Sequence, residues 1–132
     1  MKVALGTDDK KTLRKGHFGH SRYFAIIEIL NGEIVANEIR KNPHVDSGEG
    51  HNSHGEPEKI RALLEDCGLF MAKRMGRRSA ISLSTGGVDC IITDIDSVDQ
   101  AVSTYLYKKS DQFKYFSKVA DDFVPCSQRS IM

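Results

Sequence analysis

The sequence has few cysteines, and none of them stands in a disulfide or metal-binding pattern. Cys67, Cys90 and Cys126 lie far apart in the 132-residue chain and form no Cys-x-x-Cys pair. An odd number of widely spaced cysteines argues against a disulfide framework and favours a reducing compartment. Structural zinc sites usually have cysteines at fixed spacing, so a site of that type is not expected either.

Long apolar runs and an excess of one charge are also missing. No segment approaches the roughly 20 apolar residues that a membrane-spanning helix needs, and the N-terminus has no long apolar signal-peptide core. The formal net charge of +1 gives no overall field that would hold nucleic acid or an acidic membrane. We therefore expect a soluble, cytoplasmic protein that binds neither nucleic acid nor membranes.

The first third of the chain has the pattern of an antiparallel meander. Apolar runs at 2–6, 23–30 and 33–41 predict three strands. Asn31 and Gly32 both accept positive φ angles, so they predict a tight hairpin between the second strand and the third.

Helical and strand patterns then alternate. Helices are predicted at 57–67, at 77–85 and from Ser97 onward, with short strands at 69–72 and 88–94 between them. The element order βββαβαβα predicts an α/β fold. Its sheet would be mixed and five-stranded, with the three-stranded meander followed by two βα units.

The last part of the chain, residues 110–132, has apolar residues about one helical turn apart: Phe113, Phe116, Val119 and Phe123. This spacing predicts a final helix that packs on the body or contacts a partner. We therefore divide the chain into a main domain, residues 1–109, and a C-terminal extension, residues 110–132.

The five histidines lie in two polar loops. His17 and His20 follow the first predicted strand, and His44, His51 and His54 follow the third. Because βα crossovers are right-handed, both loops should emerge at the edge of the sheet where the later parallel strands end, an edge at which α/β proteins bind ligands. Imidazole is a ligand for iron, zinc, nickel and copper. The pattern predicts a metal cluster or a single transition-metal ion at this edge; the alternative is that the histidines are solvated.

Four basic residues surround the predicted start of the second helix: Lys73, Arg74, Arg77 and Arg78. Positive charge at a helix N-terminus opposes the helix dipole, whereas the free N–H groups there bind anions. The cluster therefore predicts an anionic ligand at this point, unless it is simply a solvated basic surface.

Four carboxylates also follow predicted strands: Asp8, Asp9, Asp94 and Asp96. Carboxylates that converge at strand ends can hold Mg²⁺ for phosphodiester or phosphate hydrolysis. An alternative function is therefore that of a Mg²⁺-dependent nuclease or phosphatase. The more ordinary role of such residues is to form turns and to cap helices.

Three segments carry a resemblance to a known family. They are "MKVALGTDD", "GHFGHSRYFAIIEILNGEIVANEIRKNPH" and "HG" ahead of a helix. Over about residues 1–107 the chain resembles the dinitrogenase iron-molybdenum cofactor biosynthesis family. The resemblance implies a ribonuclease-H-like, three-layer α/β fold. It also implies binding of an iron–sulfur or iron–molybdenum cluster, or a precursor, without catalysis. The chain departs from the family pattern in the basic turn at 73–76, where relatives usually carry glycines, and in the C-terminal extension.

The leading hypothesis is therefore a non-enzymatic protein that binds a metal cluster. The histidines would be the metal ligands, and the cluster-binding set would comprise His17, Phe18, Gly19, His20 and the four basic residues. Expected partners are a cluster donor or acceptor protein, and the expected state is a monomer or a weak homodimer. A third hypothesis is an adaptor domain that binds a small anion or a protein.

Overall fold

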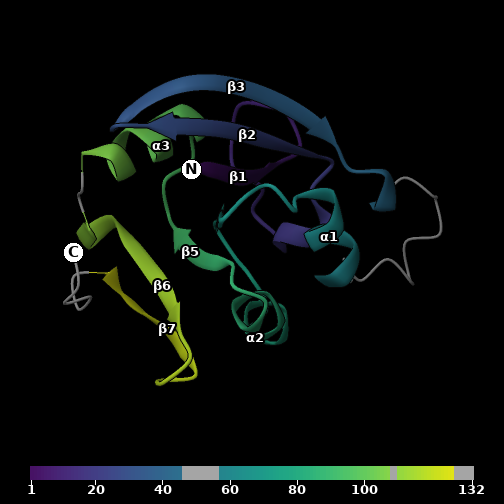
Figure 1. The fold of residues 1–132 in the computed structure, drawn as a ribbon, viewed down its shortest axis with the longest axis vertical. Coiled ribbons are helices and arrows are strands. Elements are labelled where there is room, and N and C mark those ends of the chain that lie inside the picture. Colours follow the sequence, from purple (N-terminus) through teal and green to yellow (C-terminus); the bar gives the residue numbers. More distant parts are fainter. Residues whose placement is uncertain (46–56, 108–109, 127–132) are drawn as a thin grey trace.

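A computed structural model describes residues 1–45, 57–107 and 110–126 of the chain. Within these residues, the strands form one mixed sheet in the order β3-β2-β1-β4-β5-β6-β7 (Figure 1). The strands are β1 (Lys2–Thr7), β2 (Tyr23–Leu30), β3 (Glu33–Lys41), β4 (Leu69–Ala72), β5 (Asp89–Thr93), β6 (Phe113–Ser117) and β7 (Asp122–Pro125).

The predicted meander and the two βα units are confirmed. β1 pairs with β2, and β2 with β3, in antiparallel register, whereas β4 runs parallel to β1 and β5 runs parallel to β4. Asn31 and Gly32 have positive φ angles of 55° and 79°, as the tight hairpin between β2 and β3 requires. The chain thus has an α/β fold with a mixed sheet.

Helices cover both faces of the sheet. α1 (Pro57–Leu63) and α2 (Arg77–Thr85) lie on one face, and α3 (Val98–Leu106) lies on the other. Successive residues of a strand point to opposite faces, so Phe70 packs with the α1 and α2 side while Met71 packs with α3. Both are fully buried, which explains why the central strands are continuous apolar runs. The ribonuclease-H-like assignment stays a prediction.

The predictions of a five-stranded sheet and of a helical extension are wrong. The described part of the extension is a 3₁₀ turn (Ser110–Gln112) and the hairpin of β6 and β7, which adds two antiparallel strands beside β5. Phe113 and Phe116 point to opposite faces of the sheet, and Val119, at the hairpin tip, is fully exposed. The apolar spacing that suggested a helix therefore arises from two short strands, β6 and β7, with an exposed turn between them.

One further sequence prediction concerns membranes. None of the helices described at 57–107 has the length and apolar character needed to cross a bilayer.

Candidate functional site

The loops that follow β1, β4 and β5 contact one another at the carboxyl edge of the sheet. His17 forms a β-bridge with Arg74, and Thr12 forms one with Ser97. The Leu13 N–H donates to the Asp96 carbonyl at 2.8 Å. The structure therefore brings the segments that carry His17, His20 and the basic turn together at this edge.

Two aspartates give the loop after β1 its shape. The Asp8 carboxylate accepts hydrogen bonds from Arg14 Nη1 at 2.6 Å and from the Arg22 N–H at 3.0 Å. The Asp9 carboxylate accepts the N–H groups of Thr12 and Lys11 at 2.7 and 2.8 Å, and these bonds lower the pKa of Asp9. Both carboxylates therefore hold the loop in its conformation.

Phe18 anchors the histidine segment in the core. Its ring is 3% exposed and lies with its centroid 5.0 Å from those of Phe24 and Phe70. The imidazoles of His17 and His20 flank this anchor, with ring centroids 6.2 Å apart. The buried Phe18 ring thus fixes the position of the two histidines beside the sheet.

The strand beneath this segment must carry a glycine. Ser21 Oγ donates to the Phe18 carbonyl at 2.7 Å and lies directly over Gly6. A Cβ atom at Gly6 would approach Ser21 Oγ to 2.2 Å and the Phe18 ring to 3.2 Å. Gly6 therefore allows the loop to lie close against β1.

Asn42 is a positioning residue that the sequence analysis did not single out. Its side chain is 1% exposed and donates to the carbonyls of Gly19 at 3.1 Å and Ser21 at 2.9 Å, while Oδ1 accepts the His44 N–H at 3.0 Å. In the sequence, Asn42 simply follows the end of the strand predicted at 33–41. A buried Asn after a strand could have been recognised by its capacity to bond two neighbouring backbones.

We expect replacement of Asn42 with alanine to destabilise the protein by about 1–3 kcal/mol, because it removes the bonds to the buried Ser21 carbonyl, the partly buried Gly19 carbonyl and the His44 N–H. Urea unfolding of the variant measures this loss. Serine at the same position is the control, since it restores part of the bonding. An Asn42→Ala protein as stable as the wild type would show that water replaces these bonds.

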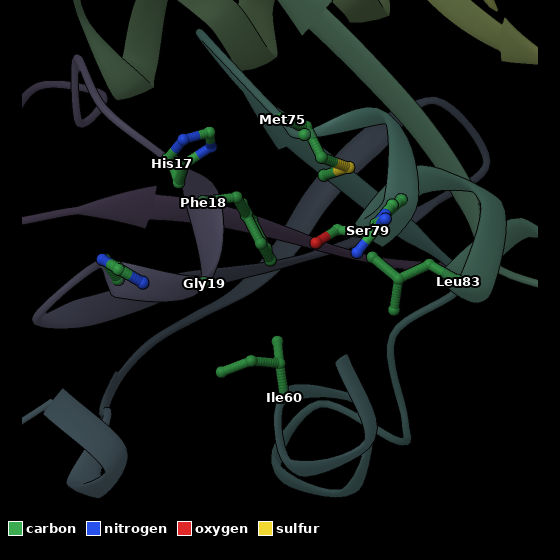
Figure 2. A pocket seen from close by; sticks show the side chains of 10 residues that line it. His17, Phe18, Gly19, Ile60, Met75, Ser79 and Leu83 are labelled. Atoms are coloured by element: carbon green, nitrogen blue, oxygen red, sulfur yellow. The ribbon is translucent and has the colours of Figure 1, made fainter. Parts of the chain in front are cut away.

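A cavity of about 200 Å³ lies between the histidine segment and α2. Its polar walls are His17, His20, Arg78 and Ser79, with Gly19 and Gly76 between them. Figure 2 shows Ser79 projecting from α2 toward the loop that carries His17 and Phe18. A Cβ atom at Gly76 would lie 3.8 Å from His17 Cε1 and Nδ1, so the imidazole packs directly on the turn before α2. We call this cavity, with its lining residues, the edge cavity.

The other walls of the edge cavity are apolar. Ile60 from α1, Leu83 from α2 and Met75 from the intervening turn line it with Phe18 (Figure 2). Ile60 lies within the helix predicted at 57–67 and is buried in the core, and its side chain also lines the cavity, which the sequence did not predict. Such a dual role depends on the packing of α1 against α2, which no local pattern reports.

The four basic residues have different surroundings. Lys73 is paired with Asp96, an interaction that lowers the pKa of the Asp96 carboxyl, and Arg77 is paired with Asp121 in the β6–β7 hairpin. Arg74 is exposed and does not line the edge cavity. Arg78 does line it and has no carboxylate partner within the described ranges. One cation of the predicted four is therefore directed to the cavity.

The remaining predicted histidine ligands are not part of this cavity as described. His44 is half-buried beside Asn42 and does not line the cavity, while His51 and His54 lie outside the described residues. In the part of the chain that the structure describes, no group of three or more His, Cys, Asp or Glu side chains is placed to hold a metal ion. The five-histidine ligand set thus stays a prediction. Of its members, His17 and His20 lie together at the edge cavity.

Cysteine thiolates, common ligands of iron–sulfur clusters, are not presented at the edge cavity. Cys67 and Cys90 are buried in the core beneath α1 and α2, and burial raises their pKa values to about 11 and about 12. Buried thiols with raised pKa values stay protonated near neutral pH and ligate metals poorly.

The Mg²⁺-dependent hydrolase alternative is not supported. Asp8 and Asp9 are bonded within their own loop, and Asp96 is paired with Lys73. These carboxylates form turns and ion pairs, which is the more ordinary role that the sequence analysis named.

Comparison with known proteins adds independent information. The profile of the family described as "Dinitrogenase iron-molybdenum cofactor" matches residues 1–108. An uncharacterised protein of Methanocaldococcus jannaschii is 27% identical over 116 residues, which cover 86% of this chain and 92% of that protein.

Solved structures also show the fold. A crystal structure of a protein proposed to be a dinitrogenase, from Methanocaldococcus jannaschii, matches with a TM-score of 0.62 and 20% identity over 83% of this chain and 90% of that chain. The apo form of the orange protein from Desulfovibrio gigas matches with a TM-score of 0.64 and 18% identity over 82% of this chain and 88% of that chain. At these identities the likeness concerns the fold alone.

Proposed function

Because this chain belongs to the dinitrogenase iron-molybdenum cofactor family, we propose that it binds an anionic metal cluster in the edge cavity. The cargo would be an iron–sulfur or iron–molybdenum-type cluster, or a precursor. The family points to cofactor biosynthesis or carrying, and the cavity supplies the chemistry that such a role needs.

The observation that carries the proposal is the set of polar groups that line the edge cavity. Two imidazoles, one arginine and the start of α2 all line the same cavity. The first turn of α2 contains no acidic residue. Its N-cap is Gly76, which has no side chain that could accept hydrogen bonds from the first N–H groups. Those N–H groups and the helix dipole favour an anion, and the Arg78 guanidinium adds a full positive charge.

The donor set favours a cluster over a single metal ion. An isolated Zn²⁺ ion needs three or four protein ligands, whereas His17 and His20 supply two. A cluster brings its own bridging sulfides, so each of its metal ions needs fewer protein ligands than an isolated ion does. The apolar walls from Ile60, Met75 and Leu83 would keep water away from the bound cluster.

We propose that the protein carries or stores the cluster and does not transform it. Three of the four carboxylates that a hydrolase would use, Asp8, Asp9 and Asp96, are bonded within loops or in an ion pair. A carrier implies a donor and an acceptor protein that recognise the carboxyl edge. The three layers, with a meander followed by two βα units, also support a ribonuclease-H-like classification of residues 1–109.

The test compares two arginines. Anaerobic reconstitution with iron and sulfide should load the wild-type chain. Arg78→Gln should weaken cluster binding about tenfold, because among the residues that the structure describes Arg78 is the arginine or lysine that lines the cavity. Arg74→Gln is the matched control: it removes the same charge from a neighbouring exposed position. Iron and sulfide per chain, measured after gel filtration at increasing salt, decide the outcome. Equal losses in both variants would mean that only the overall charge matters.

A further inference from the structure

The two arginines that begin α2 have different surroundings. Arg77 and Arg78 are the first residues of the helix, and both are exposed. Arg78 lines the edge cavity, and among the residues that the structure describes it has no carboxylate partner. Arg77 is paired with Asp121 in the turn between β6 and β7. Of two adjacent cations, one is therefore available to an anion in the cavity and the other is held by the hairpin.

Asp121 holds Arg77 at two points. Arg77 Nε donates to the Asp121 carbonyl at 3.1 Å, and Nη2 donates to the Asp121 carboxylate. The turn fixes the position of both acceptors, because Asp121 has a φ angle of 58° and its N–H donates to the Ser117 carbonyl at 2.8 Å. An arginine bonded through two nitrogens is held more firmly than one in a single exposed ion pair, which contributes little.

The hairpin that carries Asp121 is anchored beside α2 (Figure 1). Phe116 of β6 and Phe123 of β7 lie with their ring centroids 5.3 Å apart, and they pack in the same core cluster as Leu83 of α2. Leu83 also lines the edge cavity. The hairpin follows residues 1–108, which the family profile matches, so the contact with Arg77 is made by the C-terminal extension.

A released Arg77 would lie close to a ligand at the start of α2. Side chains on a helix lean toward its N-terminus, so the side chains of the first turn lean toward Gly76. Gly76 lines the edge cavity and has no side chain of its own to fill the space. A second guanidinium there would add a full positive charge to the groups that favour an anion.

We propose that Asp121 holds Arg77 away from the edge cavity and thereby limits the affinity of the cavity for its anionic cargo. The inference rests on the proposed function. A carrier has to release its cargo to an acceptor, and differences in affinity between related complexes lie mostly in the rate of release. Asp121 is thus a positioning residue, which acts on the cargo through Arg77.

Asp121→Asn tests the proposal. Asparagine accepts the left-handed conformation and keeps the backbone carbonyl, so the variant removes the carboxylate charge and leaves the turn intact. The protein is loaded anaerobically with iron and sulfide, and the loss of iron to 2,2′-bipyridine, an uncharged chelator, is followed at low ionic strength. We expect iron loss from Asp121→Asn to be about threefold slower than from the wild type, and the difference to shrink as salt is added.

Two variants serve as controls. Asp122→Asn makes the same change of charge at the next position, where the carboxylate accepts the Phe123 N–H at 2.7 Å, a bond that asparagine retains. It should lose iron at about the wild-type rate. The double variant Arg77→Gln with Asp121→Asn removes both charges of the pair and should also return to that rate.

The outcomes separate this inference from the proposed function. A wild-type chain that takes up no cluster would contradict both. If the wild type loads, a merely structural ion pair predicts iron loss from Asp121→Asn as fast as from the wild type or faster, and that result would overturn the role of Asp121. Equal slowing in Asp122→Asn, or slowing that persists in the double variant, would overturn it as well, because the effect would then not pass through Arg77.

Discussion

Replacing His17 and His20 together with alanine is expected to reduce the amount of cluster retained by the reconstituted protein about tenfold or more. Both imidazoles line the edge cavity from the segment that Phe18 anchors, and within the described residues they are the metal-ligating side chains of that cavity. Changes even to the partners of metal ligands cost about 10–100-fold in affinity, so loss of both ligands should cost at least as much. Iron analysis and absorption spectra after anaerobic gel filtration measure the effect.

His44→Ala is the matched control for this pair. His44 is half-buried beside Asn42 and does not line the edge cavity, and its backbone N–H bond to Asn42 does not need the imidazole. The control should keep its cluster. If the double variant retained as much iron as His44→Ala, the ligands would have to lie elsewhere in the chain.

Phe18→Ala is expected to have the largest effect on stability and to abolish cluster binding as well. The ring is buried against Phe24 and Phe70, and truncation of a buried phenylalanine costs about 3–5 kcal/mol. The loss also releases the segment that directs His17 and His20 into the cavity. Urea unfolding gives the stability of the variant, and anaerobic reconstitution at low temperature gives its capacity for the cluster.

Phe116→Ala separates the two effects. Phe116 is buried in the same core cluster and packs against Phe123 in the C-terminal hairpin, where it does not line the edge cavity. A similar loss of stability with normal cluster binding is expected for this variant. Equal cluster binding by both variants would contradict the positioning role of Phe18.

Much of the main fold could be predicted from local sequence. Central strands such as β1 and β4 are buried on both faces and therefore appear as uninterrupted apolar runs. The Asn31-Gly32 hairpin follows from the conformational tolerance of two residues, and Ser97 caps α3 by accepting the Gln100 N–H as its sequence indicates. These features depend on neighbours in the chain, so a single sequence reveals them.

The C-terminal hairpin could not be read in the same way. Spacings of three residues fit one face of a helix, but they also arise when an alternating strand is followed by a turn. What decides between them is the exposed edge of β5, which pairs with β6 through residues some twenty positions away. The availability of that edge is a property of the assembled sheet.

The site was foreseen only in outline for a similar reason. Topology alone brings the loops after parallel strands to one edge, so the grouping of His17 with the basic turn was predictable. Pairing partners were not, because Lys73 finds Asp96 and Arg77 finds Asp121 through tertiary contacts. Asn42, too, has its role only because two remote carbonyls lie within reach of its amide.

The most direct measurement of the central claim is the location of the bound cluster. A paramagnetic iron–sulfur cluster broadens the amide resonances of nearby residues, so ¹H–¹⁵N spectra recorded during anaerobic loading map its position. We predict that the amides of Gly19, Gly76 and Ser79 broaden first, while those of Asp111 and Lys114, at a separate cavity beside β6, stay sharp. Broadening centred away from the edge cavity, or spectra that do not change on loading, would contradict the account.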